Sequence, residues 1–302
     1  MADDENESEL LDAAREPPPR ALTRVSPMVR RLVAPNASPF TFNGTCTYIV
    51  GQGEVAIIDP GPGDDSHLSA LLAAVDGERV DTILVTHTHR DHSVAANRLR
   101  AATGARVIGA APFTPHGDGS TGLDSAHDRD YSPDATLADG ERWRGPGYTI
   151  EAVATPGHCL NHLCFALLNE GALFSGDHVM AWSTSVVAPP DGSMRAYMES
   201  LDKARGRAET IYWPGHGGPV VEPQRYLRAL IHHRRRREAS ILNTLADGPQ
   251  TIPALVAKVY VGLNPSLTRA AGLSTLAHLE DLTERGIVVA EAVDGEERFR
   301  LV

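Results

Sequence analysis

The sequence is poor in several features that define whole classes of protein. Only three of its 302 residues are cysteines, Cys46, Cys159 and Cys164, so no disulfide framework is expected and a reducing compartment suits the chain. No run of 18 apolar residues occurs, so we expect neither a membrane-spanning helix nor a membrane partner. The N-terminus is acidic and proline-rich, unlike a signal or transit peptide, and we therefore expect a cytoplasmic protein.

Aromatic residues and net positive charge are also scarce. Aromatics make up 5% of the chain, although an apolar content of 42% is ample for a core. The formal charge is −11, of which residues 1–16 contribute −6 and the remainder about −5. This balance gives no electrostatic basis for general nucleic-acid binding.

One stretch, residues 82–92, carries the most distinctive chemistry. Residues 82–85 (Thr-Ile-Leu-Val) predict a buried strand, and residues 86–92 (Thr-His-Thr-His-Arg-Asp-His) follow it directly. In extended backbone His87 and His89 point to the same side and can share one metal ion. Asp91 and His92 lie where the chain turns and can face a second ion. The alternative is a polar loop with a chance cluster of histidines, which stability alone does not explain.

The pattern His-x-His-x-Asp-His after a buried strand resembles the signature of the metallo-β-lactamase superfamily. Three later motifs resemble the remaining metal motifs of that family, in the expected order: residues 155–158 (Thr-Pro-Gly-His), 174–177 (Phe-Ser-Gly-Asp) and 212–217 (Tyr-Trp-Pro-Gly-His-Gly). The resemblance implies one metal held by His87, His89 and His158, a second held by Asp91, His92 and His216, and Asp177 as the bridge between them.

Such a site predicts a binuclear hydrolase. Two divalent ions are expected, with zinc as the first choice and iron or manganese able to fill the same ligands. Ions roughly 3.5–4 Å apart can share a hydroxide that attacks a carbonyl or phosphoryl centre. Asp91 is the predicted catalytic residue, because its carboxylate would accept a hydrogen bond from that hydroxide and orient it.

Four further residues near these motifs allow two interpretations each. Asp59 would either orient a metal ligand from behind or bind the amides of its own turn. His178 and His162 would either donate a proton to the leaving group or pack behind the ligands. Cys159 could be a soft ligand, but the family resemblance already places Asp177 where zinc β-lactamases carry a cysteine.

The pattern of predicted elements indicates an α/β fold. Alternating strands and helices predict a layered sheet, and the resemblance implies an αββα sandwich over residues 21–245, after an acidic, proline-rich leader at 1–20 that we expect to be disordered. Two helices and a hairpin with an Asp294-Gly295 turn predict a small winged-helix-like α+β unit at 246–302. The expected helices are residues 64–75, 91–103, 222–242, 252–260 and 266–285.

Residues 111–134 break this pattern. They are rich in glycine, proline and aspartate without periodicity, and predict a surface loop that could act as a lid. For its two histidines, His116 and His127, simple solvation is the more ordinary interpretation.

The substrate is the most open question. The layout resembles the lactamase-β-like and glyoxalase II-like branches, which makes a small ester or thioester the first expectation and single-stranded RNA the alternative, with β-lactam hydrolysis or a non-catalytic binding protein less favoured. In the RNA case the basic run Arg234, Arg235, Arg236 and Arg237 would contact the phosphate backbone. A charge run of this kind is more often a solvated helix face, and residues 245–302 carry a net charge of −3. The pattern does not indicate an oligomeric state.

Overall fold

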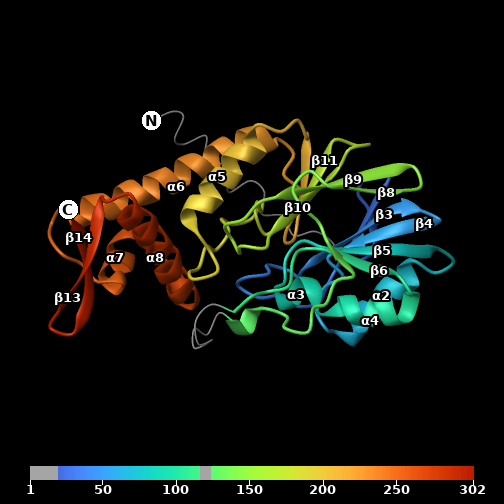
Figure 1. Ribbon diagram of the computed structural model, residues 1–302, viewed down its shortest axis with the longest axis horizontal. Helices are drawn as coiled ribbons and strands as arrows, with labels where there is room; N and C mark the ends of the chain where they lie inside the picture. Colours follow the sequence, from blue (N-terminus) through green and yellow to red (C-terminus); the bar gives the residue numbers. More distant parts are fainter. Residues whose placement is uncertain (1–19, 116–123) are drawn as a thin grey trace.

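The computed structural model describes residues 20–115 and 124–302. Two β-sheets lie face to face, helices cover both outer faces, and a smaller helical unit with a hairpin follows at the carboxyl end (Figure 1). The predicted leader, apart from Arg20, and His116 lie outside the described residues.

The first sheet has seven strands in sequence order. Neighbours pair antiparallel from β1 to β4 and parallel from β4 to β7. Strands β3 and β4 form a tight hairpin in which Gly53 alone separates them, with φ at +74°. The strands are β1 (Thr23–Arg24), β2 (Val29–Val33), β3 (Cys46–Gln52), β4 (Glu54–Ile58), β5 (Arg79–Val85), β6 (Arg106–Gly109) and β7 (Ala135–Thr136).

The second sheet has five strands in the order β12-β11-β10-β9-β8. All pairs are antiparallel except β11 with β12, which are parallel. The strands are β8 (Arg142–Gly145), β9 (Tyr148–Ala154), β10 (Leu163–Leu167), β11 (Ala172–Gly176) and β12 (Ile211–Pro214).

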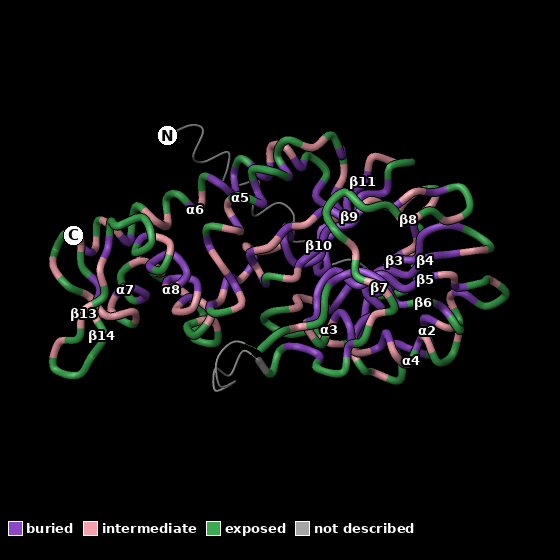
Figure 2. The backbone as a smooth tube through the Cα atoms, in the orientation of Figure 1, coloured by how far each residue is buried: buried purple, intermediate pink, exposed green. Residues whose placement is uncertain are grey.

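Three apolar layers hold the sandwich together. Tyr48, Phe165 and Phe174 are buried between the two sheets. A second layer packs helices α2 (Asp65–Ala74) and α4 (Ala95–Thr103) on the first sheet, and a third packs α5 (Met194–Arg205) and α6 (Pro223–Leu245) on the second. The buried tube segments of Figure 2 follow these layers. The αββα sandwich expected from the sequence is confirmed.

One predicted helix is divided. The sequence predicted a continuous helix at 91–103, but α3 (Arg90–Ser93) and α4 are separated at Val94. The amide of Ala95 donates to the carbonyl of Gly61, a bond of 3.1 Å to the loop after β4. This tertiary bond diverts a donor from the helix and ties the metal-motif loop to the neighbouring strand.

The carboxyl-terminal unit has the predicted winged-helix-like layout. Helices α7 (Ile252–Val259) and α8 (Thr268–Glu284), with the 3₁₀ turn η2 (Pro265–Leu267) between them, precede the hairpin of β13 (Val288–Val293) and β14 (Glu296–Leu301). Asp294 and Gly295 both have positive φ, as a two-residue hairpin turn requires.

Helix α6 belongs to both cores. It runs three residues beyond the predicted end at 242. Tyr226, Leu227 and Leu230 pack on the sandwich, whereas Ile241 and Leu245 pack in the carboxyl-terminal core. The division at 245/246 stays a prediction, and this packing places the last turns of α6 with the second unit. No helix in the described ranges has the length and apolarity to span a bilayer.

Replacing Leu279 by alanine tests the carboxyl-terminal core. Leu279 is fully buried on α8, so Leu279→Ala should lower the free energy of unfolding by about 2–5 kcal/mol. Val261→Ala, at a side chain that is 89% exposed, is the matched control and should change it by less than about 0.5 kcal/mol. Urea denaturation measures both, and equal effects would contradict the packing described.

Candidate metal centre

Four segments bring the predicted ligands to one edge of the sandwich. His87, His89, Asp91 and His92 follow β5, and His158 lies between β9 and β10. Asp177 follows β11 directly, and His216 follows β12. Each segment leaves a buried strand, so the side chains of both sheets converge where the strands end.

The first group consists of His87, His89, His158 and Asp177. Their ligand-type atoms all lie within 4.8 Å of one another. His89 Nδ1 is 3.0 Å from the Nε2 atoms of both His87 and His158, and His158 Nε2 is 3.7 Å from Asp177 Oδ2. Three imidazole nitrogens thus face one point.

The second group consists of Asp91, His92 and His216. Asp91 Oδ2 lies 3.3 Å from the Nε2 atom of each histidine, and those two Nε2 atoms lie 3.4 Å from Asp177 Oδ1. Asp177 therefore presents one carboxylate oxygen to each group, which is the arrangement of a bridging ligand.

In four of the histidines Nδ1 lies against a polar atom outside the two groups, and this leaves Nε2 as the nitrogen that faces the centre. His158 Nδ1 donates to the carbonyl of Val186 at 2.6 Å, and His216 Nδ1 lies 3.3 Å from the carbonyl of Gly44. His92 Nδ1 donates to Asp59, and His87 Nδ1 lies 3.0 Å from Thr86 Oγ1. When Nδ1 carries the proton, Nε2 keeps its lone pair free, as metal-binding histidines require.

Asp59 connects β4 to the ligands of β5. Its carboxylate accepts from the amide and hydroxyl of Thr86 at 2.8 Å each and from His92 Nδ1 at 2.9 Å. Its φ of +49° is uncommon for a residue with a side chain, and these three bonds hold it there. Both interpretations from the sequence hold, since Asp59 binds a backbone amide and also orients His92.

The electrostatics of the centre favour a cation. Burial opposes the charged form of His92, but Asp91, Asp177 and Asp59 raise its pKa well above the ordinary value. Burial likewise opposes charge on His216, yet Asp177 and Asp91 raise its pKa to about 9. His92 Nε2 and Asp177 Oδ1 are buried and make no hydrogen bond to the described residues. The donor set and these unpaired atoms suit divalent metal ions.

In the first group, unlike the second, the neutral forms of His87 and His89 are favoured. Burial, with His158 next, lowers the pKa of His89 to about 3, and burial with His92 and His89 lowers the pKa of His87 well below its ordinary value. Neutral imidazole is the form that binds metal.

The remaining candidates take different places. The Nε2 atom of His162 accepts from the amide of Asp177 at 3.1 Å, so His162 holds the bridging residue in position. His178 is fully buried, and its ring packs against Tyr197 rather than facing the metal groups. Burial lowers the pKa of His178 to about 3, which does not suit a proton donor. Cys159 is buried, with its thiol against Asn161 rather than the metal groups.

His127 was expected to be a solvated loop residue, and this expectation is wrong. It is buried, stacks on Phe113 with ring centroids 3.8 Å apart, and pairs with Thr88 Oγ1 at 2.9 Å and with Asp191. His127, Asp128 and Tyr131 are thus buried, with His127 against His89, whereas most of the other residues from 125 to 134 are exposed, as in the predicted surface loop. Periodicity gave no signal for this, because the partners are distant in sequence.

Two supporting residues were missed by the sequence reasoning. Thr45 Oγ1 donates to Asp91 Oδ2 at 2.9 Å, and Val186 binds His158 through its carbonyl. Thr45 directly precedes the buried strand β3, and a polar residue at a strand end was the available signal. A backbone carbonyl such as that of Val186 carries none.

The basic run on α6 is not one solvated face. Arg235 and Arg236 are exposed, but Arg234 is 4% exposed and donates to the carbonyl of Ser185. Arg237 lies over the ring of Tyr260, 3.9 Å from its centroid. The expectation that all four arginines could contact RNA is therefore wrong for Arg234, since its side chain is enclosed.

The family model of the metallo-beta-lactamase superfamily matches residues 40–216, which include both metal groups. The chain belongs to the metallo-β-lactamase superfamily. A second model, the beta-lactamase associated winged helix domain, matches residues 251–295. As predicted, the chain is a metal-dependent hydrolase of this superfamily with a winged-helix unit.

Several known proteins are similar to this chain over most of its length. The chain is 32% identical to a beta-lactamase-like protein 2 homolog of Drosophila melanogaster over 91% of this chain and 95% of that protein. It is 34% identical to an atrochrysone carboxyl ACP thioesterase of Aspergillus fumigatus over 74% of this chain and 66% of that protein. A beta-lactamase domain protein from Burkholderia ambifaria has the same fold, with a TM-score of 0.80 at 23% identity over 98% and 99% of the two chains.

Asp59→Asn tests the support of His92. The asparagine amide is neutral and has one accepting oxygen, so it cannot accept hydrogen bonds from His92 and Thr86 as the carboxylate does. Metal affinity should therefore fall about 10–100-fold with the fold retained. Competition with a chelator of known affinity measures this. Asp76→Asn, an exposed position on the same sheet's periphery, is the control and should leave affinity unchanged.

Proposed function

We propose that this hydrolase is binuclear and acts on a small thioester. The observation that carries the proposal is the pair of facing ligand groups with one Asp177 oxygen directed at each. Bound there, two divalent ions would supply an activated water and polarise the substrate carbonyl. Zinc is the proposed metal, and iron or manganese suit the same donors.

The side chains would divide the work as follows. His87, His89 and His158 would hold one ion, Asp91, His92 and His216 the other, and Asp177 would bridge them. Thr45 fixes Oδ2 of Asp91, which leaves Oδ1 to accept a hydrogen bond from the attacking water and orient it. Burial of His87, His92 and His216 limits their contact with bulk water and strengthens these interactions.

A thioester is favoured over the other substrate classes. The similar Aspergillus fumigatus protein is named as a thioesterase, which supports this class for the present chain. The bridging position holds Asp177 instead of cysteine, which weighs against β-lactams. RNA is the weaker candidate, because Arg234 is buried and the described surface offers only Arg235 and Arg236 of the basic run.

Metal removal tests the proposal directly. The protein as purified should contain about two metal ions per chain by elemental analysis, and it should hydrolyse S-acyl glutathione. Prolonged chelation should abolish the hydrolysis, and added zinc should restore it, because the ligands alone provide no activated water.

Two variants separate the centre from the rest of the chain. His87→Ala should lose metal and activity together, whereas His232→Ala, an exposed histidine on α6, should keep both. Single-stranded RNA is assayed in parallel. Metal-dependent RNA cleavage without thioester hydrolysis, or fewer than about one metal per chain, would contradict the proposed function.

A further inference from the structure

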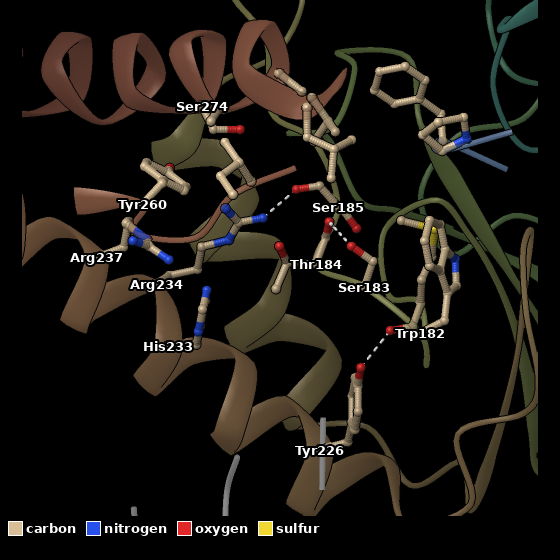
Figure 3. Close-up of a pocket in the computed structure, with 18 residues that line it drawn as sticks. Trp182, Ser183, Thr184, Ser185, Tyr226, His233, Arg234, Arg237, Tyr260 and Ser274 are labelled. Carbon is tan, nitrogen blue, oxygen red and sulfur yellow. Dashed lines mark hydrogen bonds between the residues drawn. The ribbon is translucent and has the colours of Figure 1, made fainter. Parts of the chain in front are cut away.

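A cavity of about 420 Å³ lies between the metal-bearing sandwich and the winged-helix unit. Its walls come mainly from the segment Trp182 to Val186, from α6, from α8, and from residues between α7 and α8 such as Tyr260 and Leu263 (Figure 3). This volume is in the range of small-molecule sites. We call it the basic cavity, after its three basic residues His233, Arg234 and Arg237.

Arg234 is a buried cation without a counterion. It is 96% enclosed, and no carboxylate of the described residues pairs with it. Its one hydrogen bond to these residues goes from Nη2 to the carbonyl of Ser185, while Nε is buried and unpaired. Its guanidinium lies 5.1 Å from the ring centroid of Tyr197, which supports the charge only in part. A buried guanidinium with free donors is a site for an anion.

The rest of the cavity has the same character. Arg237, fixed over Tyr260 and bonded to the carbonyl of Val259, lines the cavity beside Arg234. Thr184 and Ser274 add hydroxyl groups, and no aspartate or glutamate of the described residues is in the lining. Every charge that lines the basic cavity is therefore positive.

The pKa values of two histidines near Arg234 and Arg237 are lowered. Burial, and then Arg234 and Arg237, lower the pKa of His233 to about 4 and that of His278, on α8, to about 3. Both imidazoles are thus held neutral near pH 7, which leaves the two arginines as the cations of the cavity.

The basic cavity and the metal centre share a wall. The carbonyl of Ser185 accepts from Arg234, and the carbonyl of the next residue, Val186, accepts from His158. Trp182, at the start of the same segment, lies against Gly217, next to His216. The anchors of Arg234 and of His158 are therefore carbonyls of consecutive residues in one segment.

We propose that the basic cavity binds an anionic group, a phosphate or a carboxylate, at the end of the substrate remote from the scissile bond. The inference rests on the proposed thioester hydrolysis and specifies its substrate as a thioester whose thiol half carries an oxyanion. The apolar side chains of Trp182 and Leu263 in the lining suit the carbon chain between the two ends.

The test compares three thioesters with one acyl group. Their thiol halves are neutral, carboxylate-bearing or phosphate-bearing and of similar length. The wild-type protein should have the higher kcat/KM for at least one anionic thioester, and the better of the two identifies the oxyanion. Arg237→Gln should lower the ratio of anionic to neutral kcat/KM about 10–100-fold, chiefly through KM, because a charged hydrogen bond is lost.

Two comparisons guard the result. Arg237→Lys keeps the charge and should recover part of the ratio, while Arg235→Gln, an exposed neighbour outside the lining, should leave all three values unchanged. Since a partly misfolded variant loses activity on all three substrates alike, the ratio reports the cavity itself. Equal kcat/KM for all three thioesters, or an unchanged ratio in Arg237→Gln, would overturn the proposal.

Direct binding separates this proposal from the proposed function. Calorimetry with the S-methyl ethers of the two anionic thiols, which cannot be hydrolysed, should show binding by the wild type and about 10–100-fold weaker binding by Arg237→Gln. If no thioester is hydrolysed but this difference is found, the proposed function fails and the anion site stands. If neither ether binds to the wild type, the anion site fails.

Discussion

The structure depends on the two-sided carboxylate of Asp177. A single carboxylate can serve two groups of ligands only if it enters between them, and the parallel pairing of β11 and β12 places Asp177 and His216 at the same edge to make this possible. The amide of Asp177 is held by His162, and both groups of histidines are held from outside by Thr86, Asp59 and Val186. The β-sandwich thus holds seven polar side chains close together, four of them buried and three half-buried, against their tendency to remain hydrated.

The sequence was sufficient to group the candidate ligands because their chemistry is local. His87, His89, Asp91 and His92 are adjacent in the chain, and the other ligands follow strands whose apolar runs are easy to recognise. The helix boundaries near 94 and 242 were less predictable, since the first is set by a bond from Ala95 to Gly61 and the second by packing of Leu245 in another core.

The surroundings of the ligands could not be predicted in the same way. A histidine such as His127 and an arginine such as Arg234 are ordinary surface residues by composition, and only the approach of distant segments buries them. The same holds for His178, whose place beside Asp177 in sequence suggested chemistry although its ring packs on Tyr197. Burial of a polar group is a tertiary property, so sequence patterns set the ligands but not their environment.

The adjacent carbonyls of Ser185 and Val186 have a consequence for selectivity. One anchors an arginine and the other anchors a candidate ligand imidazole, so the two partners bind consecutive peptide units, and a displacement of one partner would move the anchor of the other. Occupancy on one side would then adjust the alignment of His158 on the other. A molecule recognised at its distant end would thereby be held by the same backbone segment that orients His158, and its selection would appear chiefly in KM.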